Sequence, residues 1–283
     1  MPHKQGPERG EFLSGYPPDC ERAQVFLWCA ATLFKHKARI NPVNPIILIP
    51  ARMGSSRLPG KPMALINGRP MILHVLDRAR EAAIAPIAVA CCDIEVFDAV
   101  IADGGVAVMT DPKLPSGSDR AKQAADLLDP SCIYNIVINL QGDLPTLARG
   151  MLSAVLAPLE DRAFDLATLV APIESAEEAA RSSVVKAVCA FAPGQSIASA
   201  LYFSRATVPW GAGPLWHHIG IYAWRREALA RFVALPESPL EQREKLEQLR
   251  ALEAGMRVAC AMADHAPFGI DTLADLERAR AML

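Results

Sequence analysis

Residues 45–62 read PIILIPARMGSSRLPGKP, and this stretch decides the fold. Its opening residues, 45–51, are wholly apolar, which is typical of a strand buried on both faces of a parallel sheet. The loop that follows is rich in Gly, Ser and Pro and carries three cations, Arg52, Arg57 and Lys61. A glycine-rich turn lets backbone N–H groups approach an anion, and the three cations suit a triphosphate. The loop has neither the GxxxxGK[ST] spacing of a P-loop nor the GxGxxG spacing of a dinucleotide site.

Downstream of this loop, apolar runs alternate with segments of helical periodicity as far as about residue 165. This alternation predicts a doubly wound, mostly parallel, Rossmann-like α/β sheet. Ligands in such folds bind beyond the carboxyl ends of the strands, so we expect Arg52, Ser116 and Asp143 to converge there. The expected strands are 85–92, 106–110 and 133–143, and the expected helices are 70–83, 94–104, 116–129 and 147–160.

The pattern changes after residue 165. Two strand-like runs flank a Pro-Gly turn, which predicts an inserted antiparallel β-hairpin subdomain at about 184–222. Such an insertion often forms a subunit contact. Residues 240–255 read LEQREKLEQLRALEAG and predict one strongly charged helix ended by a glycine. A late strand at 258–263 and a closing helix at 272–283 complete the expected domain, which spans 45–283.

Residues 1–44 differ from the rest of the chain. A polar opening rich in Gly and Pro precedes an apolar run at 23–34. That run is too short to span a bilayer, which needs about 20 residues. A long acidic leader and the lack of a clean cleavage site argue against a signal peptide. We expect a poorly ordered N-terminal extension without stable membrane insertion, and a short interfacial helix is the alternative.

Composition excludes several classes of protein. The 283 residues are 51% hydrophobic, with 29 basic against 31 acidic side chains, so nucleic-acid binding is not expected. Seven cysteines form no C-x-x-C pair, which favours buried thiols in a reducing cytoplasm over zinc or disulfides. Without a G-x-S-x-G motif, hydrolase chemistry lacks its nucleophile.

Two aspartates stand at the ends of predicted elements. Asp143, in NLQGDLP, lies at a predicted strand tip beside a glycine and can coordinate Mg²⁺, although a turn-former is the alternative. Asp271, in GIDT, comes just before a predicted helix. It could cap that helix, but Thr272 can serve as the cap instead. Ser118, in SGSDR, is also open to a plain capping role.

The motifs together resemble a known family. PARxxSxRLPGKP, SGSDR, NLQGDLP, ALYFSRATVPW, HHIGIY, SPLEQREKLEQLR and GIDTLADLERAR occur in the order and spacing of the Kdo cytidylyltransferases, or CMP-Kdo synthetases. The resemblance covers residues 45–283. It implies a nucleotidyltransferase fold and the transfer of CMP from CTP to the acidic sugar Kdo (3-deoxy-D-manno-octulosonate), with release of pyrophosphate. It further implies Mg²⁺ as cofactor, a cytoplasmic homodimer, and a role in lipopolysaccharide synthesis.

The resemblance also assigns residues. It implies that Asp143 and Asp271 are the metal ligands and act with Arg52 and Lys61 in catalysis. In many members a Glu follows the first Asp, whereas this chain has Leu144. The nucleotide would contact Arg52, Ser55, Arg57, Lys61, Ser116, Gly117 and Gln141. The sugar would contact Arg120, Gln141, Tyr202, His218, Tyr222, Glu244 and Gln248.

Some of these roles have plainer alternatives. Arg120 could simply pair with Asp119, and a lone histidine such as His218 is usually structural. Glu244 and Gln248 lie four residues apart and are expected to share one helix face. Two other functions stay open. One is a cytidylyltransferase for another acidic sugar, such as 8-amino-Kdo or sialic acid. The other is a nucleotide-binding homologue without catalysis.

Overall fold

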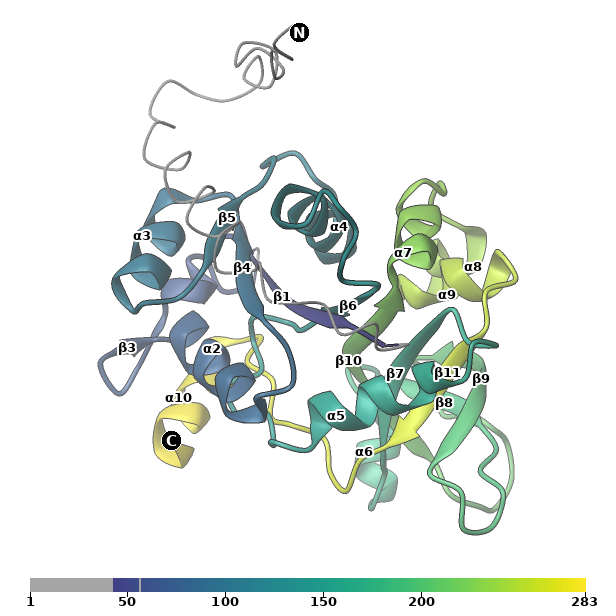
Figure 1. Ribbon diagram of the computed structural model, residues 1–283. Coiled ribbons are helices and arrows are strands. Elements are labelled where there is room, and N and C mark those ends of the chain that lie inside the picture. Colours follow the sequence, from purple (N-terminus) through teal and green to yellow (C-terminus); the bar gives the residue numbers. More distant parts are fainter. Residues whose placement is uncertain (1–42, 56) are drawn as a thin grey trace, which may run out of the picture.

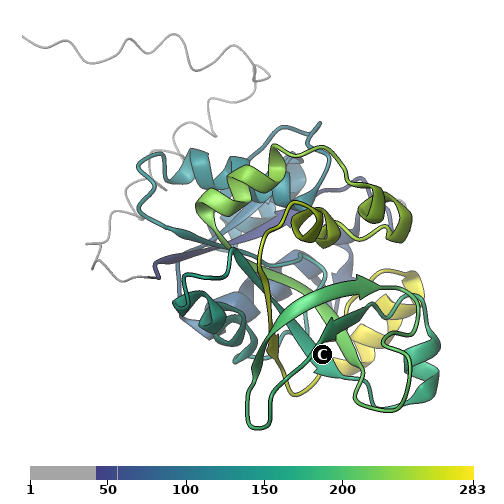
Figure 2. The same cartoon turned by 90° about the vertical axis from the view of Figure 1, so that its right-hand side faces the viewer.

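The computed structural model describes residues 43–55 and 57–283, so the predicted N-terminal extension lies almost wholly outside the described residues. One nine-stranded sheet crosses the molecule, and helices cover both of its faces (Figures 1 and 2). Its strands are β1 Pro45–Ala51, β4 Ile87–Cys91, β5 Ala107–Met109, β6 Ile136–Asn139, β7 Leu166–Pro172, β8 Lys186–Cys189, β9 Ile197–Ser204, β10 Trp216–Arg225 and β11 Val258–Met262. A separate small ribbon pairs β2 Leu65–Ile66 with β3 Arg69–Pro70.

The helices are mostly short. The longest, α2 and α4, lie on opposite faces of the sheet (Figure 1). No helix among the described residues is long and apolar enough to cross a bilayer. The helices are η2 Lys61–Met63, α2 Met71–Ala82, α3 Ile94–Ala102, α4 Gly117–Leu128, α5 Met151–Leu156, η3 Ala157–Glu160, α6 Ala176–Ala180, α7 Arg226–Val233, α8 Pro239–Glu244, α9 Gln248–Glu253 and α10 Leu273–Met282.

Strand β1 shows why two cores share one sheet. Successive side chains of a strand point to opposite faces. Ile47 and Ile49 therefore pack with α2, α3 and α5, whereas Ile46 and Leu48 pack with α4, α7 and α9. All four side chains are fully buried, as a wholly apolar run predicts. Parallel pairing with β4 on one side and β6 on the other places β1 inside the sheet.

The strand order β5-β4-β1-β6-β10-β7-β11-β9-β8 is that of a mixed sheet, in which only β9 and β10 run against the direction of the other described strands. The first four strands are parallel, as the βαβ alternation indicated. Strand β10, however, runs antiparallel to β6, β7 and β8, and β9 runs antiparallel to β8 and β11. The sheet is mixed because β8, β9 and β10 follow one another without the crossover helices that parallel neighbours require.

The predicted hairpin is present but is not a separate unit. β8 and β9 pair antiparallel around a turn that contains Gly194. β9 also pairs with β11, and β8 also pairs with β10, so the hairpin extends the main sheet. Its outer face carries the exposed side chain of Leu201.

The charged helix predicted for 240–255 is instead two short helices, α8 and α9. Lys245 ends α8 in the left-handed conformation, with φ 57°. The guanidinium of Arg205 donates hydrogen bonds to the carbonyls of Glu244 and Lys245, which satisfies the groups that a continuing helix would have used. The break turns Leu246 inward, where it is buried in the core.

Candidate active site

The loop after β1 is anchored at both ends. The backbone N–H of Met53 donates to a carboxylate oxygen of Asp93 over 2.8 Å, and the N–H of Gly60 donates to the carbonyl of Met53 over 3.0 Å. Gly60 has a φ of 70°, a left-handed conformation that glycine adopts without strain. This turn starts the short helix η2 at Lys61 and directs the chain back across the ends of the strands.

Hydrogen bonds join the two segments that carry the predicted metal ligands. The N–H of Ile270 donates to the carbonyl of Asp143 over 3.0 Å. The hydroxyl of Thr146 exchanges hydrogen bonds with both the carbonyl and the N–H of Phe268. Asp143 follows β6 and Asp271 precedes α10, so these contacts bring two distant parts of the chain to one place.

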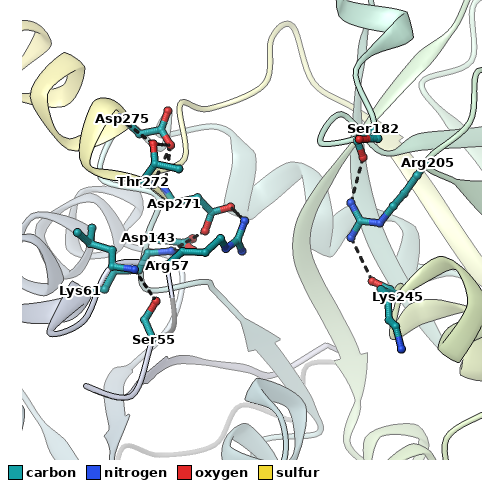
Figure 3. A network of polar contacts seen from close by, with 11 residues as sticks. Ser55, Arg57, Lys61, Asp143, Ser182, Arg205, Lys245, Asp271, Thr272 and Asp275 are labelled. Carbon is teal, nitrogen blue, oxygen red and sulfur yellow. Dashed lines mark hydrogen bonds and ion pairs between the residues drawn. The ribbon is translucent and has the colours of Figure 1, made fainter.

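Lys61 lies between the two carboxylates (Figure 3). Its Nζ is 2.6 Å from Oδ2 of Asp143 and 2.9 Å from Oδ1 of Asp271. The side chain of Lys61 is only 13% exposed, against 30% for Asp143 and 46% for Asp271. Arg57 adds a second cation, with Nη1 3.0 Å from Oδ2 of Asp271. Four charges therefore meet at one side of the site.

A cavity of about 460 Å³ opens beside this cluster, at the carboxyl ends of β1 and β6 and the start of α4. Arg52 lines it with an exposed guanidinium that makes no ion pair with any described residue. Each residue that the resemblance assigned to the nucleotide or the metal lines this cavity: Arg52, Ser55, Arg57, Lys61, Ser116, Gly117, Gln141, Asp143 and Asp271.

The start of α4 forms the opposite wall. Ser116 is the helix N-cap, and its hydroxyl accepts hydrogen bonds from the N–H groups of Ser118 and Asp119. The same hydroxyl donates to the carboxylate of Asp119 over 2.6 Å, so Asp119 does not pair with Arg120. Arg120 is buried and donates instead to the hydroxyl of Thr110, at the end of β5.

Gly142 lets the strand ends come close together. A Cβ added there would lie 2.9 Å from the carbonyl oxygen of Pro50, closer than real Cβ atoms approach. The glycine therefore allows the β6 segment to pass against the end of β1. As a result, Gln141 and Asp143 reach the cavity on either side of it.

Part of the predicted sugar-binding set forms a buried polar cluster. Nε2 of His218 is 3.0 Å from the hydroxyl of Thr168, and Nδ1 is 3.4 Å from the amide nitrogen of Gln248. The hydroxyl of Tyr222 donates to Oε1 of Gln248 over 3.2 Å. Burial and, to a smaller extent, the neighbouring His217 together lower the pKa of His218 to about 3, so the imidazole is neutral near pH 7. Burial likewise raises the pKa of Tyr222 far above its usual range.

Glu244 lies apart from this cluster, which corrects the expectation that it shares a helix face with Gln248. The two residues belong to different helices, α8 and α9. The carboxylate of Glu244 accepts hydrogen bonds from the hydroxyl of Ser204 and the N–H of Arg205. Neither Glu244 nor Tyr202 lines the cavity at Lys61, and the same holds for His218, Tyr222 and Gln248.

The sequence analysis missed Glu247. Its Oε2 accepts a hydrogen bond from the hydroxyl of Ser118 over 3.1 Å, while Oε1 is buried and has no partner among the described residues. Burial raises the pKa of Glu247, and the nearby hydroxyls of Ser116 and Ser118 partly oppose this rise. The contact with Ser118 joins the start of α9 to the start of α4, and the charge of Glu247 also acts on Tyr222 of the buried cluster. The side chain of Glu247 points toward Ser118 because the helix breaks at Lys245, and nothing in the sequence marks that break.

The two aspartates fit a divalent cation. An oxygen of each carboxylate converges on one point, and hard oxygen ligands are those that Mg²⁺ prefers. Among the residues that the structure describes, no three acidic, histidine or cysteine side chains form a metal-binding group. Two carboxylates leave the other positions of an octahedron to phosphate oxygens and water, as is usual for Mg²⁺ bound with a nucleotide.

A cavity at the strand ends of an α/β sheet, with a cationic glycine turn facing paired carboxylates, defines a protein of the nucleotidyltransferase class. The comparisons agree, because the family model described as Cytidylyltransferase matches residues 46–258. A 3-deoxy-manno-octulosonate cytidylyltransferase from Rhodospirillum centenum is 60% identical over 86% of this chain and 94% of its own length. Its counterpart from Paramagnetospirillum magneticum is 58% identical over 85% of this chain and 98% of its own length.

A solved structure points the same way. CMP:2-keto-3-deoxy-manno-octonic acid synthetase, complexed with CTP, has a TM-score of 0.77 and 42% identity, and the match covers 84% of this chain and 98% of that one. The chain therefore belongs to the 3-deoxy-manno-octulosonate cytidylyltransferase family.

Proposed function

We propose that this protein transfers CMP from CTP to Kdo and releases pyrophosphate. The membership of the family supports the reaction, and the arrangement of Lys61 between Asp143 and Asp271 beside a cation-lined cavity is the observation that carries it. The C2 hydroxyl oxygen of Kdo forms a bond to the α-phosphorus of CTP. The bond from that phosphorus to the pyrophosphate oxygen breaks, and the hydroxyl proton passes from the sugar to solvent water.

The cations of the loop have distinct tasks in this proposal. Arg52 is exposed and lacks an ion pair with any described residue, so its guanidinium is available to the triphosphate. Arg57 and Lys61 start from contacts with carboxylates and offset the negative charge that develops on the departing pyrophosphate. Little covalent work falls to the protein, so positioning and electrostatics dominate catalysis.

Asp143 and Asp271 are the residues that would hold Mg²⁺. When bound, the ion polarises the α-phosphate and lowers the energy of its extra charge in the transition state. The N-terminus of α4, with Ser116 and Gly117 at the cavity wall, suits the nucleotide. Gln141 and Arg120 line the same cavity and lie within reach of either substrate.

We place the sugar next to the buried cluster of His218, Tyr222 and Gln248. A sugar with several hydroxyls needs both donors and acceptors, and this cluster supplies a neutral imidazole, a phenol and an amide. Glu247 supports the location, because its unpartnered Oε1 is a buried acceptor on a residue that contacts the start of α4 and lies near Tyr222. We do not place Glu244 or Tyr202 against the sugar, because neither lines the cavity and the carboxylate of Glu244 already accepts hydrogen bonds from Ser204 and Arg205.

Pyrophosphate release tests the proposal directly. The purified protein is incubated with Mg²⁺, CTP and one of three sugars: Kdo, 8-amino-Kdo or sialic acid. We expect Kdo to give the highest kcat/KM. Equal or higher turnover with another sugar would show that this protein is a cytidylyltransferase for that sugar instead. CTP binding by calorimetry without any Mg²⁺-dependent product would show a nucleotide-binding protein that lacks catalysis.

We also propose that the protein is a cytoplasmic homodimer and that CMP-Kdo serves lipopolysaccharide synthesis. The exposed apolar side chains of Leu201, on β9, and Trp210, in the loop after it, support assembly through the hairpin. Leu201 is 66% exposed and Trp210 is 100% exposed. Large apolar side chains so exposed often mark an interface between proteins.

A further inference from the structure

The ammonium of Lys61 occupies the point where the two carboxylates of the site converge. Its Nζ is within 2.9 Å of one oxygen from Asp143 and one from Asp271. A divalent cation shared by the same carboxylates would lie about 2.1 Å from an oxygen of each. The ammonium already contacts both of those oxygens, so it competes with any metal that would need them.

The charges of the cluster are balanced without a metal. Asp143 and Asp271 contribute two negative charges, and Lys61 and Arg57 contribute two positive ones. Adding a divalent cation would leave an excess of positive charge in a partly buried site, where screening by water is weak. A divalent metal without nucleotide should therefore bind only weakly at this cluster, because it would have to displace Lys61.

A nucleoside triphosphate changes that balance. Its phosphates bring several negative charges into the cavity that Lys61 and Arg52 also line. They give the ammonium new acceptors in place of the carboxylates, and they supply further oxygen ligands for the metal. Both effects favour the divalent cation only when the triphosphate is present.

We propose that Lys61 is a built-in counter-ion that keeps divalent metal out of the free enzyme and yields its place when CTP binds. Lys61 thereby holds Asp143 and Asp271 in position before the nucleotide arrives. The carboxylates would otherwise repel each other. This inference rests on the proposed function, since it assumes that the two aspartates are the metal ligands.

Mn²⁺ binding, measured by the relaxation of water protons, tests the inference without an activity assay. In the absence of nucleotide we expect the Lys61→Met variant to bind Mn²⁺ at least tenfold more tightly than the wild type. The apparent melting temperature of the variant should rise with MnCl₂, whereas that of the wild type should not. With CTP present, the wild type should bind Mn²⁺, seen as enhancement beyond that of Mn²⁺ and CTP alone.

Two further variants make the outcome specific. Lys61→Met combined with Asp143→Asn should lose the gained Mn²⁺ affinity, because one ligand is gone. Lys122→Met removes a lysine that pairs with Asp126 over 2.6 Å outside the cavity, and it should bind Mn²⁺ as the wild type does.

The results separate two kinds of failure. Tight Mn²⁺ binding by the nucleotide-free wild type, or none by Lys61→Met, would overturn the counter-ion role while leaving the metal site of the proposed function intact. Absence of Mn²⁺ binding by the wild type even with CTP would instead refute the metal site itself.

Discussion

The side chains of Asp143 and Asp271 meet only through Lys61, which lies 82 residues before the first and 210 before the second. From the sequence alone, Asp143 could be a turn-former, Asp271 a helix cap and Lys61 a surface cation. Their convergence within 3 Å of one nitrogen excludes such independent roles. At the residue scale, the catalytic proposal therefore depends on these three side chains.

Replacing either aspartate should abolish catalysis without unfolding the protein. We expect Asp143→Asn and Asp271→Asn to lower kcat by at least about 10²–10³-fold, because each removes a carboxylate that would hold the Mg²⁺ ion that stabilises the transition state. The exposed Asp98, on α3, provides a matched control, and Asp98→Asn should keep the wild-type rate. Steady-state pyrophosphate release measures the effect, with circular dichroism to check folding. A near-normal rate would remove that aspartate from the site.

His218 should make stability depend on pH. Its folded pKa of about 3 is below the usual 6.5, so between these values the unfolded chain binds a proton that the folded protein does not. The stabilisation is complete above pH 6.5 and falls by about 1.4 kcal/mol per pH unit as pH drops toward 3. Urea unfolding at pH 7 and pH 5 should show a smaller pH dependence for His218→Gln than for the wild type.

The control for this measurement is the exposed His265, for which His265→Gln should reproduce the wild-type pH dependence. Parallel curves for His218→Gln and the wild type would contradict the assignment of a buried neutral imidazole.

At the scale of elements, the ends of helices orient the site. The break between α8 and α9 at Lys245 turns Glu247 and Gln248 inward, and Arg205 holds that break by donating to the carbonyls of Glu244 and Lys245. The same guanidinium also donates to the carbonyl of Ser182, so it ties the break to a distant loop (Figure 3). At the start of α10, Thr272 and Asp275 form a capping box. Capping was the alternative role for Asp271, and the box leaves the carboxylate of Asp271 free to face Lys61.

Asp275 should therefore act as a positioning residue for Asp271. Its Oδ2 accepts hydrogen bonds from the N–H groups of Asp271 and Thr272 and from the hydroxyl of Thr272. We expect Asp275→Ala to lower the free energy of unfolding by about 1 kcal/mol, as for other lost caps. It should also weaken the apparent Mg²⁺ affinity on the order of tenfold, as for other residues that orient metal ligands.

The comparison for that variant is Glu277→Ala, on the same helix, which removes an exposed pair with Arg280 and should change neither quantity appreciably. Thermal unfolding and Mg²⁺ titration of the initial rate measure both. A loss of stability with unchanged Mg²⁺ dependence would reduce Asp275 to a structural cap.

At the scale of the whole molecule, one mixed sheet carries the cavity at one end of its strands and the exposed hairpin elsewhere. The parallel part supplies Arg52, Lys61 and Asp143, and the antiparallel part supplies the cluster at His218. Segments from nearly the full described length are needed for one site.

Assembly through the hairpin should depend on its exposed apolar side chains. We expect the wild type to elute as a dimer, and a Leu201→Ser, Trp210→Ser double variant to be monomeric, because apolar contact area would be lost. Ile94, on α3, is 56% exposed, and Ile94→Ser should leave the dimer intact. Light scattering after size exclusion measures the mass, and a dimeric double variant would place the interface elsewhere.

Removing the N-terminal extension should leave the reaction unchanged. We propose that residues from 45 onward form the working domain, because the family model begins at residue 46 and the cavity is lined by residues 50–271. A chain that starts at residue 44 should keep kcat and KM close to those of the full chain, because it retains every residue that lines the cavity. A large loss in either parameter would give the extension a part in catalysis.

The sequence by itself determined β1 to the residue, most of the alternation up to β6, and the loop chemistry at Arg52, Arg57 and Lys61. Local apolar patterning and turn residues decide these features, and both are visible in a short window of sequence. It also identified Asp143 and Asp271 as partners, but only through resemblance to a family.

Only the tertiary structure decided the direction of β10, the break at Lys245 and the orientation of Glu247. Each depends on a contact with a distant segment: pairing with β6 and β7, the guanidinium of Arg205, and the hydroxyl of Ser118. Helical periodicity in 240–255 is continuous, so no local signal marks the break. Long-range hydrogen bonds outweighed the local preference there, because an interrupted helix buries Leu246 and has its end carbonyls bound by Arg205, which follows β9.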